Sequence, residues 1–190
     1  MVEAVAEKGY VRVAVADVIE RAGVSRKTFY EQFANKEDCF LAAYDAGVNG
    51  LLAAIDDALS ELAPDWLAAS RRAVEVYLDE MAVSPAFARA FLIEVLGAGP
   101  EALARRDVVQ ERFAAQLAGI HARARADIPE IPALAPHVFR AAVGAVNELV
   151  TAHVLEHGAP TLPELTDAVL DVDLAMLVGR ELAQRIAQTT

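Results

Sequence analysis

The chain has 190 residues, of which 55% are hydrophobic and 24% charged, and its formal net charge at pH 7 is −11. A hydrophobic share of this size excludes a globally disordered chain. Charges break the longest apolar stretches, so neither a membrane span nor a signal peptide is expected. The single cysteine, Cys39, allows no internal disulfide, which fits a reducing cytoplasm.

Apolar residues recur at three- and four-residue steps along nearly the whole chain, which predicts an all-α protein. The first predicted helix covers residues 1–8 and ends at Gly9. This helix is short for its apolar pattern, so we expect that a further segment precedes Met1. Residues 11–15 alternate like a strand, but without a partner strand they are predicted to link the first two helices.

A tight turn joins the next two predicted helices. The second helix is predicted over about 15–22, and Gly23 supplies the left-handed turn residue. Ser25 is a good N-cap for a third helix that runs to Phe33.

Asn35 caps a long fourth helix, and proline or glycine interrupts the helical pattern at later points. From this point on, helices are predicted near 35–62, 64–83, 85–97, 100–125, 134–157 and 162–187. The sequence therefore predicts about nine helices in two domains. A three-helix helix-turn-helix DNA-binding domain occupies 1–46, and a larger helical ligand-binding and dimerisation domain occupies 47–190.

The start of the third helix has the chemistry of a DNA-reading element. In a helix-turn-helix protein the first residues of the second helix of the motif reach base edges in the major groove. Arg26 and Lys27 can donate to guanine O6 and N7, and the Thr28 methyl can contact thymine. Tyr30 can donate its hydroxyl to a phosphate. Lys36 lies at the next helix start, where free backbone N–H groups also favour an anion.

The surroundings of this helix favour the same interpretation. Phe29 and Phe33, four residues apart, are expected to point inward and hold it in place. Residues 21–36 contain four basic residues and one acidic residue, whereas 48–190 contain eleven basic and twenty acidic residues. Because salt screens charges beyond about 8–10 Å, an acidic body weakens non-specific DNA binding without abolishing a focused site. An Arg-Lys pair alone is more often a solvated helix face, and it is the combination with the turn, cap and aromatics that favours DNA.

Four short segments in a specific order and spacing carry a resemblance to a known family. They are Gly9-Tyr10, Val15-Ala-Asp-Val18, Ala22-Gly-Val-Ser-Arg-Lys-Thr-Phe-Tyr-Glu-Gln-Phe33 and Asn35-Lys-Glu-Asp38. Together they resemble the N-terminal domain of TetR-type transcriptional regulators, over roughly residues 2–47.

The resemblance implies a homodimer that binds double-stranded operator DNA, usually as a repressor, and releases it when a small-molecule effector enters the C-terminal domain. By position, the resemblance places Arg26, Lys27 and Thr28 at bases or nearby phosphates, and Tyr30 and Lys36 at the DNA backbone.

Two further residues complete the predicted DNA-binding set, Ser25 as the cap and Arg12 as a substitute contact. Family members commonly carry a threonine near the start of the second helix that caps it and touches phosphate. Here Val13 and Ala14 stand at that place. Arg12 could replace the phosphate contact but not the cap.

The two C-terminal helices are apolar on more than one side, so each is expected to be buried twice. We expect them to pair with their copies across a two-fold axis in a four-helix interface. The predicted interface residues are Phe139, Val143, Val146, Val150, Val169, Val172, Met176 and Ala183.

A ligand cavity is predicted from aromatic residues and from polar residues on apolar stripes. The candidates are Trp66, Tyr77, Phe87, Phe91, Glu94, Phe113, His121 and Asn147. Aromatic residues at such spacings are more often plain core. A cavity of this kind is mainly apolar with few polar anchors, which favours a lipophilic ligand.

The sequence contains neither a Gly-rich phosphate loop nor a nucleophile elbow, so an enzyme is not expected. His153 and His157 have the spacing of metal ligands on a helix, but such a pair is more often solvated. We therefore expect no metal and no cofactor. Two alternatives stay open: a helical protein–protein interaction module without DNA binding, which the acidic balance favours, and a small-molecule carrier or degenerate enzyme.

Overall fold

The computed structural model describes residues 1–60 and 65–179, which form nine α-helices and two 3-10 helices and contain no strand. The α-helices are α1 (Val2–Lys8), α2 (Val15–Ala22), α3 (Arg26–Gln32), α4 (Lys36–Ser60), α5 (Trp66–Val83), α6 (Pro85–Leu92), α7 (Pro100–Asp127), α8 (Pro136–His157) and α9 (Thr166–Leu177). The 3-10 helices are η1 (Glu94–Gly97) and η2 (Ala159–Leu165). The predicted all-α fold is confirmed.

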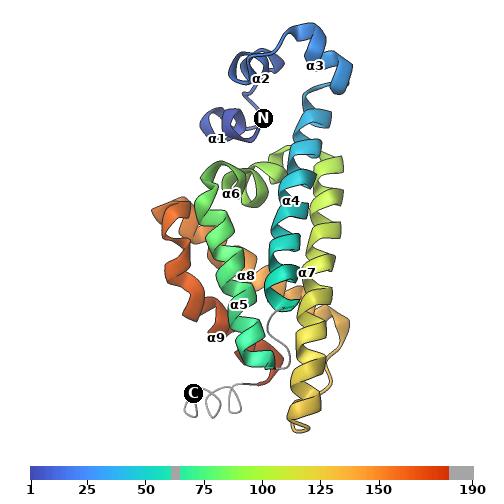
Figure 1. Cartoon of the computed structure of the whole chain (residues 1–190), viewed down its shortest axis with the longest axis vertical. Coiled ribbons are helices and arrows are strands. Elements are labelled where there is room, and N and C mark those ends of the chain that lie inside the picture. Colours follow the sequence, from blue (N-terminus) through green and yellow to red (C-terminus); the bar gives the residue numbers. More distant parts are fainter. Residues whose placement is uncertain (61–64, 180–190) are drawn as a thin grey trace.

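Helices α1 to α3 form a small head at one end of an elongated molecule, and α5 to α9 form the body (Figure 1). Gly23 ends α2 with a φ of 65°, a left-handed conformation that glycine adopts without steric cost. The Ser25 hydroxyl accepts the Thr28 N–H at 3.0 Å and caps α3. Phe29, on the inner side of α3, is 4% exposed. Helices α2 and α3 are therefore held relative to each other by a turn, a cap and a buried ring.

Helix α4 joins the head to the body and runs beside α7 (Figure 1). It is one unbroken helix from Lys36 to Ser60, so the predicted domain boundary after residue 46 falls inside it. Its buried residues alternate with exposed ones at helical spacing, from Phe40 near the head to Ile55 in the body. Helix α4 is therefore a continuous connection between the head and the body.

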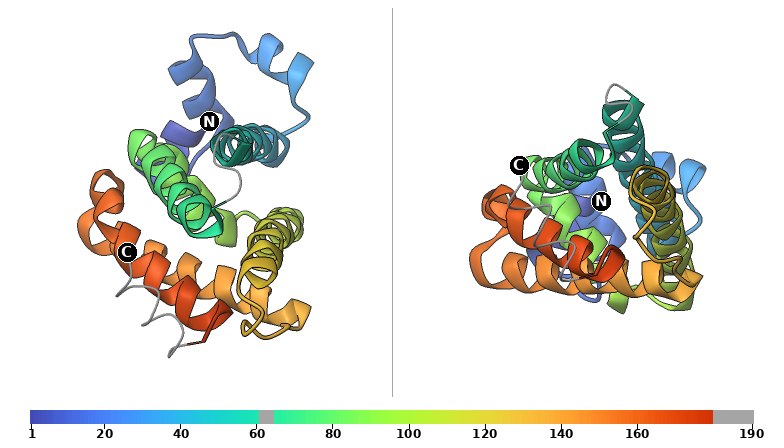
Figure 2. Two further views of the ribbon diagram at one scale, coloured as in Figure 1. Left: turned by 60° about the horizontal axis from the view of Figure 1, so that its bottom comes forward. Right: turned by 90° about the horizontal axis from the view of Figure 1, so that it is seen from below.

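The buried apolar residues form two clusters. The larger one extends without a gap from Val5 and Phe29 in the head to Leu78, Met81 and Leu92 in the body. The smaller one surrounds Trp66 and includes residues of α7, α8 and α9. Helix α8 lies along an outer edge of the body (Figure 2). The head thus shares a core with the body, whereas α8 covers that core from one side only.

Two predicted helices differ from the structure. The helix predicted over 85–97 is broken at Ile93, where a 3-10 turn begins and the Glu94 carboxylate is held by other groups. The helix predicted over 162–187 starts as 3-10 turns and its α-helical part ends at Leu177, just before Gly179 with a φ of 85°. Residues 180–190 lie outside the described part of the chain.

Helices α4 and α8 are long and apolar enough to cross a membrane by length and composition alone, although the sequence predicts no span. One or two such helices are weak evidence for a membrane span, because core helices have the same composition. Helix α4 is such a core helix, because 44% of its most apolar segment is buried inside the protein. Helix α8 fits this description less well, because only Phe139, Ala142 and Val150 are buried within this chain.

Candidate DNA-binding and effector sites

Helix α3 presents its first turn at the tip of the head (Figure 1). Arg26, Lys27, Thr28 and Tyr30 are all exposed. The side chain of Lys27 is 86% exposed, and its 3.8 Å contact with Glu31 leaves the ammonium in solvent. Within the described residues Arg26 forms no ion pair. This turn can therefore donate hydrogen bonds to an acceptor outside the protein.

Four of the predicted DNA-binding residues also have contacts inside the head. The Ser25 and Thr28 hydroxyls lie 2.9 Å apart, so they are oriented by each other. Lys36 Nζ donates to the Tyr10 carbonyl at 2.8 Å and lies 4.3 Å from the centre of the Tyr10 ring. Arg12 Nε donates to the Lys8 carbonyl at 2.6 Å. Lys36 and Arg12 thus stabilise the head, and their role at DNA stays a prediction.

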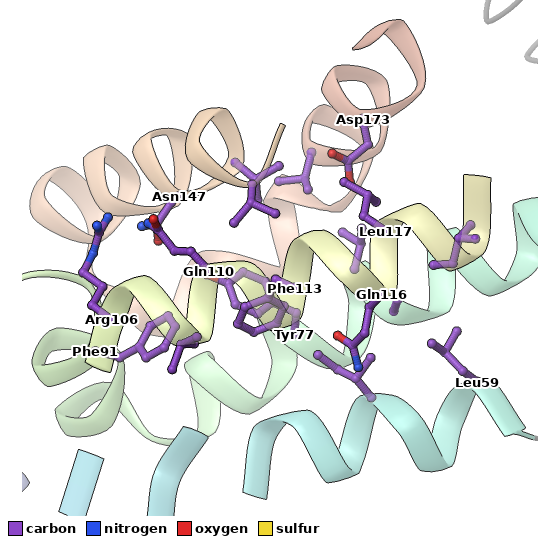
Figure 3. A pocket seen from close by; sticks show the side chains of 18 of the residues that line it. Leu59, Tyr77, Phe91, Arg106, Gln110, Phe113, Gln116, Leu117, Asn147 and Asp173 are labelled. Carbon is purple, nitrogen blue, oxygen red and sulfur yellow. The ribbon is translucent and has the colours of Figure 1, made fainter. Parts of the chain in front are cut away.

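An apolar cavity of about 110 Å³ lies inside the body. Helices α4 to α9 all contribute to its wall (Figure 3). Its apolar lining includes Ile55, Leu59, Val74, Tyr77, Phe91, Val109, Phe113, Leu117, Ile120, Val143, Val146 and Val169. The cavity follows one face of α7, on which Arg106, Gln110, Phe113, Leu117 and Ile120 succeed each other at three- and four-residue steps.

A cation and a hydroxyl mark one end of the cavity. With its amide oxygen turned toward Arg106, Gln110 accepts from Nη1 at 3.0 Å and from Nη2 at 2.7 Å. Arg106 Nε and the Tyr44 hydroxyl are buried without a hydrogen-bond partner in residues 1–60 and 65–179. Burial raises the pKa of Tyr44, and the charge of Arg106 partly offsets this. Asn147 lies at the same end (Figure 3). These groups can receive an anionic or polar head group.

A carboxyl group marks the other end, near Leu117 (Figure 3). Oδ1 of Asp173 is buried and has no hydrogen-bond partner in the described part of the chain. Burial alone raises the pKa of Asp173 to about 7. Asp173 also lines a second, smaller cavity with Trp66 and His121. A buried carboxyl without a partner is unfavourable for folding, so its presence calls for a functional explanation.

The predicted ligand residues separate into three groups. Tyr77, Phe91, Phe113 and Asn147 line the main cavity. Trp66 and His121 line only the smaller one, where His121 is 5% exposed and burial lowers its pKa. Phe87 and Glu94 line neither cavity, so the structure does not support their assignment to a ligand site.

Phe87 and Glu94 instead connect elements of the protein. The Phe87 ring packs on Gly47 of α4 so closely that a Cβ there would lie 2.1 Å from a ring carbon. Glu94 accepts the backbone N–H of Tyr10 at 2.7 Å and pairs with Arg89 at 3.1 Å. Glu94 therefore joins the body to the head rather than a ligand to the protein.

The predicted dimer residues face mainly into their own subunit. Phe139 and Val150 are buried, and Val143, Val146 and Val169 line the main cavity. This stripe was expected to meet a partner chain, and the structure corrects that expectation because the stripe covers the body's own core. Val172 and Met176 are half-buried, and Ala183 lies outside the described residues.

The exposed face of α8 is the opposite one, and it consists largely of small residues. It includes Ala141, Gly144, Glu148, Ala152 and Leu155. Such a face lets a second helix approach closely.

His153 donates to or accepts from the Thr161 hydroxyl at 2.8 Å and lies 4.8 Å from the His157 ring. Residues 1–60 and 65–179 contain no cluster of three or more potential metal-ligating residues.

Sequence reasoning missed Arg106 and Asp173 at the ends of the main cavity. Each is a lone charged residue within a stripe of apolar residues on a helix, Arg106 three residues before Val109 and Asp173 four after Val169. That signal was available, but many such residues reach the surface. Only the tertiary structure shows that Arg106 and Asp173 line the same cavity.

Comparison with known proteins agrees with this geometry. Residues 2–43 match the family described as bacterial regulatory proteins, tetR family. Over 94 residues the chain is 34% identical to the HTH-type transcriptional regulator EthR of Mycolicibacterium smegmatis. That match covers 50% of this chain and 43% of EthR, so the chain matches less than half the length of this relative.

Solved structures share the fold over nearly the whole chain. The transcriptional regulator FadR from Bacillus subtilis, in complex with stearoyl-CoA, has a TM-score of 0.81 at 20% identity, covering 94% of this chain and 95% of FadR. A bacterial regulatory protein in the tetR family from Rhodococcus RHA1 has a TM-score of 0.73 at 20% identity, covering 93% and 92%. The first helices of this chain are thus similar to the tetR family of bacterial regulatory proteins, and the chain shares its fold with these solved regulators over nearly its whole length.

Proposed function

We propose that the protein is a cytoplasmic, homodimeric repressor that binds operator DNA through α3 and releases it when a lipophilic molecule enters the body cavity. The observation that carries this proposal is the combination of an exposed cationic first turn of α3 with an apolar cavity whose wall includes α4. Helix α4, which directly follows α3 in the chain, thus connects the two sites, and so ligand and DNA can favour different positions of it.

The size of the cavity supports a mechanical link. At about 110 Å³ it is smaller than the roughly 300–1,000 Å³ of most ligand pockets. A ligand that fills an ordinary pocket is larger than this cavity, so it must push the cavity walls apart when it binds. Tyr44 of α4 stacks on Phe91 across the cavity wall, at 5.7 Å between ring centres. Displacing Tyr44 moves α4, and with it the head.

The link to the head continues through aromatic contacts and one ionic group. Phe40 packs on Tyr44 at 6.3 Å and on Tyr10 at 4.9 Å between ring centres. Tyr10 is also held by Glu94, at the end of α6, through its backbone N–H. A ligand that favours one position of α4 or α6 therefore shifts the population of head orientations.

A homodimer supplies two reading heads, which must lie one helical turn of DNA apart, about 34–36 Å. The outer face of α8, with Ala141, Gly144 and Ala152 exposed, is our candidate for the interface. Its small side chains let the α8 helices of two subunits pack closely.

The proposal is tested by fluorescence anisotropy with labelled DNA from upstream of the protein's own gene. We expect saturable binding whose affinity falls as salt concentration rises, because each phosphate contact releases counterions. A scrambled duplex of the same length is the control. Equal binding to both duplexes, or no binding at 50 mM salt, would contradict the proposal and favour an interaction module without DNA binding.

A further inference from the structure

The two ends of the main cavity have opposite chemistry. Arg106 and the Tyr44 hydroxyl present unsatisfied donors at one end, and the unpartnered Oδ1 of Asp173 presents an acceptor at the other. The wall between them is apolar, with Tyr77 and Phe113 in the middle (Figure 3). The carboxylate of an unsubstituted fatty acid would satisfy the donors at the first end, but its hydrocarbon tail would leave Asp173 at the second end without a partner.

We infer that the cavity takes a long-chain carboxylic acid with a hydroxyl group near its distal end, the carboxylate lying at Arg106 and the hydroxyl at Asp173. This inference rests on the proposed function, because it specifies the chemical class of the effector. It assigns to Asp173 the role of a specificity-determining residue.

The Arg106 end fits a carboxylate. Its guanidinium is fixed by Gln110 and forms no ion pair with an acidic residue in the described part of the chain. The Tyr44 hydroxyl stays protonated, since burial raises its pKa, and can donate a second hydrogen bond. A planar guanidinium and a neighbouring hydroxyl are a common way to hold a carboxylate.

The Asp173 end fits a hydroxyl better than a methyl group or an ammonium group. A buried carboxyl accepts a hydrogen bond in its ionised form and can also donate one in its neutral form, and burial places its pKa near 7. A methyl group leaves this site unsatisfied, and sites built to hydrogen-bond a hydroxyl discriminate strongly against analogues that lack it. An ammonium group would have to be fully desolvated in an apolar wall.

The length of the cavity sets the position of the hydroxyl. Arg106 and Leu117, which lies next to Asp173 (Figure 3), are eleven residues apart on α7, or about 16 Å along the helix axis. An extended chain covers about 1.2 Å per bond, so the hydroxyl lies roughly 12 to 16 carbons from the carboxylate. The second cavity, which Asp173 also lines, can hold the end of a somewhat longer acyl chain.

Isothermal titration calorimetry with the full chain tests this inference. The probes are hexadecanoate, 2-hydroxyhexadecanoate, 16-hydroxyhexadecanoate and 16-aminohexadecanoate. We expect 16-hydroxyhexadecanoate to bind about 10- to 100-fold more tightly than hexadecanoate, the range for a buried hydrogen bond to a charged group. The 2-hydroxy acid should bind like hexadecanoate.

Variants connect that preference to one residue. In Asp173→Leu the preference for the 16-hydroxy acid should disappear or reverse, and in Asp173→Asn it should be partly kept, because the amide oxygen still accepts a hydrogen bond. Asp171→Asn, on the exposed side of the same helix, should bind like the parent. Thermal melting verifies that each variant is folded.

Several results would overturn the inference: equal binding of hexadecanoate and its 16-hydroxy form, tighter binding of the amino acid derivative, an unchanged preference in Asp173→Leu, or no binding of any acid. The DNA measurement separates these failures from failure of the proposed function. If the parent protein binds upstream DNA and releases it with another lipophilic molecule, the proposed function holds and only the proposed effector class is wrong.

Discussion

At the scale of single residues, we propose that the exposed turn of α3 divides base reading and DNA backbone contact between different side chains. Arg26 and Lys27 project from the first turn, where side chains reach base edges. Tyr30 is 49% exposed one turn later, and its ring packs edge-on against Phe29 at 5.3 Å between ring centres. The contact with the buried Phe29 ring therefore orients the Tyr30 side chain.

Two substitutions distinguish these roles. Arg26→Ala should lower affinity for the preferred sequence by about 1–3 kcal/mol and relax base preference at one or two positions, because a donor to guanine is lost. Tyr30→Phe should lower affinity for all sequences alike, by about 1 kcal/mol. Competition binding with a set of single-base-substituted duplexes measures both. An unchanged base profile in Arg26→Ala would contradict the assignment.

Asp173 gives the protein a pH-dependent stability. Its folded-state pKa of about 7 lies above the ordinary value of 3.8, so the folded state holds a proton that the unfolded state has lost. This group therefore lowers stability progressively as pH rises from about 4 to 7.

The amide variant reveals this effect. Asp173→Asn cannot ionise, so its stability advantage over the parent should grow by on the order of 2 kcal/mol between pH 5 and pH 8. His121 lines the same small cavity and is present in both proteins, so its contribution to the pH dependence of stability is the same in both. Chemical denaturation at the two pH values measures the difference, with Asp171→Asn as the control. An advantage that is equal at both pH values would show that Asp173 is not desolvated.

At the scale of elements, glycine and aromatic residues determine how α4 meets α6. Gly47 lets the Phe87 ring lie against the α4 backbone, so the angle between the two helices depends on a missing side chain. The sequence predicted α4 and α6 correctly as helices, since caps, prolines and apolar periodicity are local signals. It did not predict the role of Phe87, because a close approach between two helices leaves no local pattern.

Gly47→Ala should destabilise the protein by about 1–3 kcal/mol through overpacking. Gly50→Ala is the matched control on the same helix, because a Cβ there meets nothing within 4 Å. It should instead stabilise by up to about 1 kcal/mol, the helix propensity difference. Urea unfolding measures both, and adding Phe87→Leu to Gly47→Ala should restore part of the loss. Equal effects at the two glycines would contradict the proposed packing.

Contacts between residues far apart in the sequence explain where the predicted elements differ from the structure. The predicted helix over 85–97 ends early because Glu94 pairs with Arg89 and accepts the N–H of Tyr10, which lies 84 positions away in the sequence. The stripe of Phe139, Val143 and Val146 was assigned to a partner chain because periodicity identifies a buried face but not what buries it. The structure shows that the same subunit buries it.

At the scale of the whole molecule, we propose the outer face of α8 as the surface that meets a second copy of the chain. Helix α8 lies at the edge of the body (Figure 2) and has few buried residues despite its apolar composition. Small residues on that face permit close helix packing, and a large charged residue would prevent it.

Ala152→Arg should therefore convert a dimer into a monomer without unfolding it, because Ala152 is exposed within the subunit. Sedimentation velocity at micromolar concentration measures the change, and the monomer should also lose most of its DNA affinity, since two heads no longer act together. Leu103→Arg is the control, because Leu103 is 44% exposed on α7. A dimeric Ala152→Arg, or a monomeric parent, would place the interface elsewhere or remove it.

The central claim is that a lipophilic molecule in the body cavity and DNA at α3 compete through α4. The most direct measurement is fluorescence anisotropy of labelled upstream DNA with the protein, titrated with stearoyl-CoA, hexadecanoate or 16-hydroxyhexadecanoate. We expect at least one of these ligands to weaken DNA binding by about five-fold or more, and Arg106→Gln to reduce this effect. Ligand binding detected by calorimetry with no change in DNA affinity would contradict it.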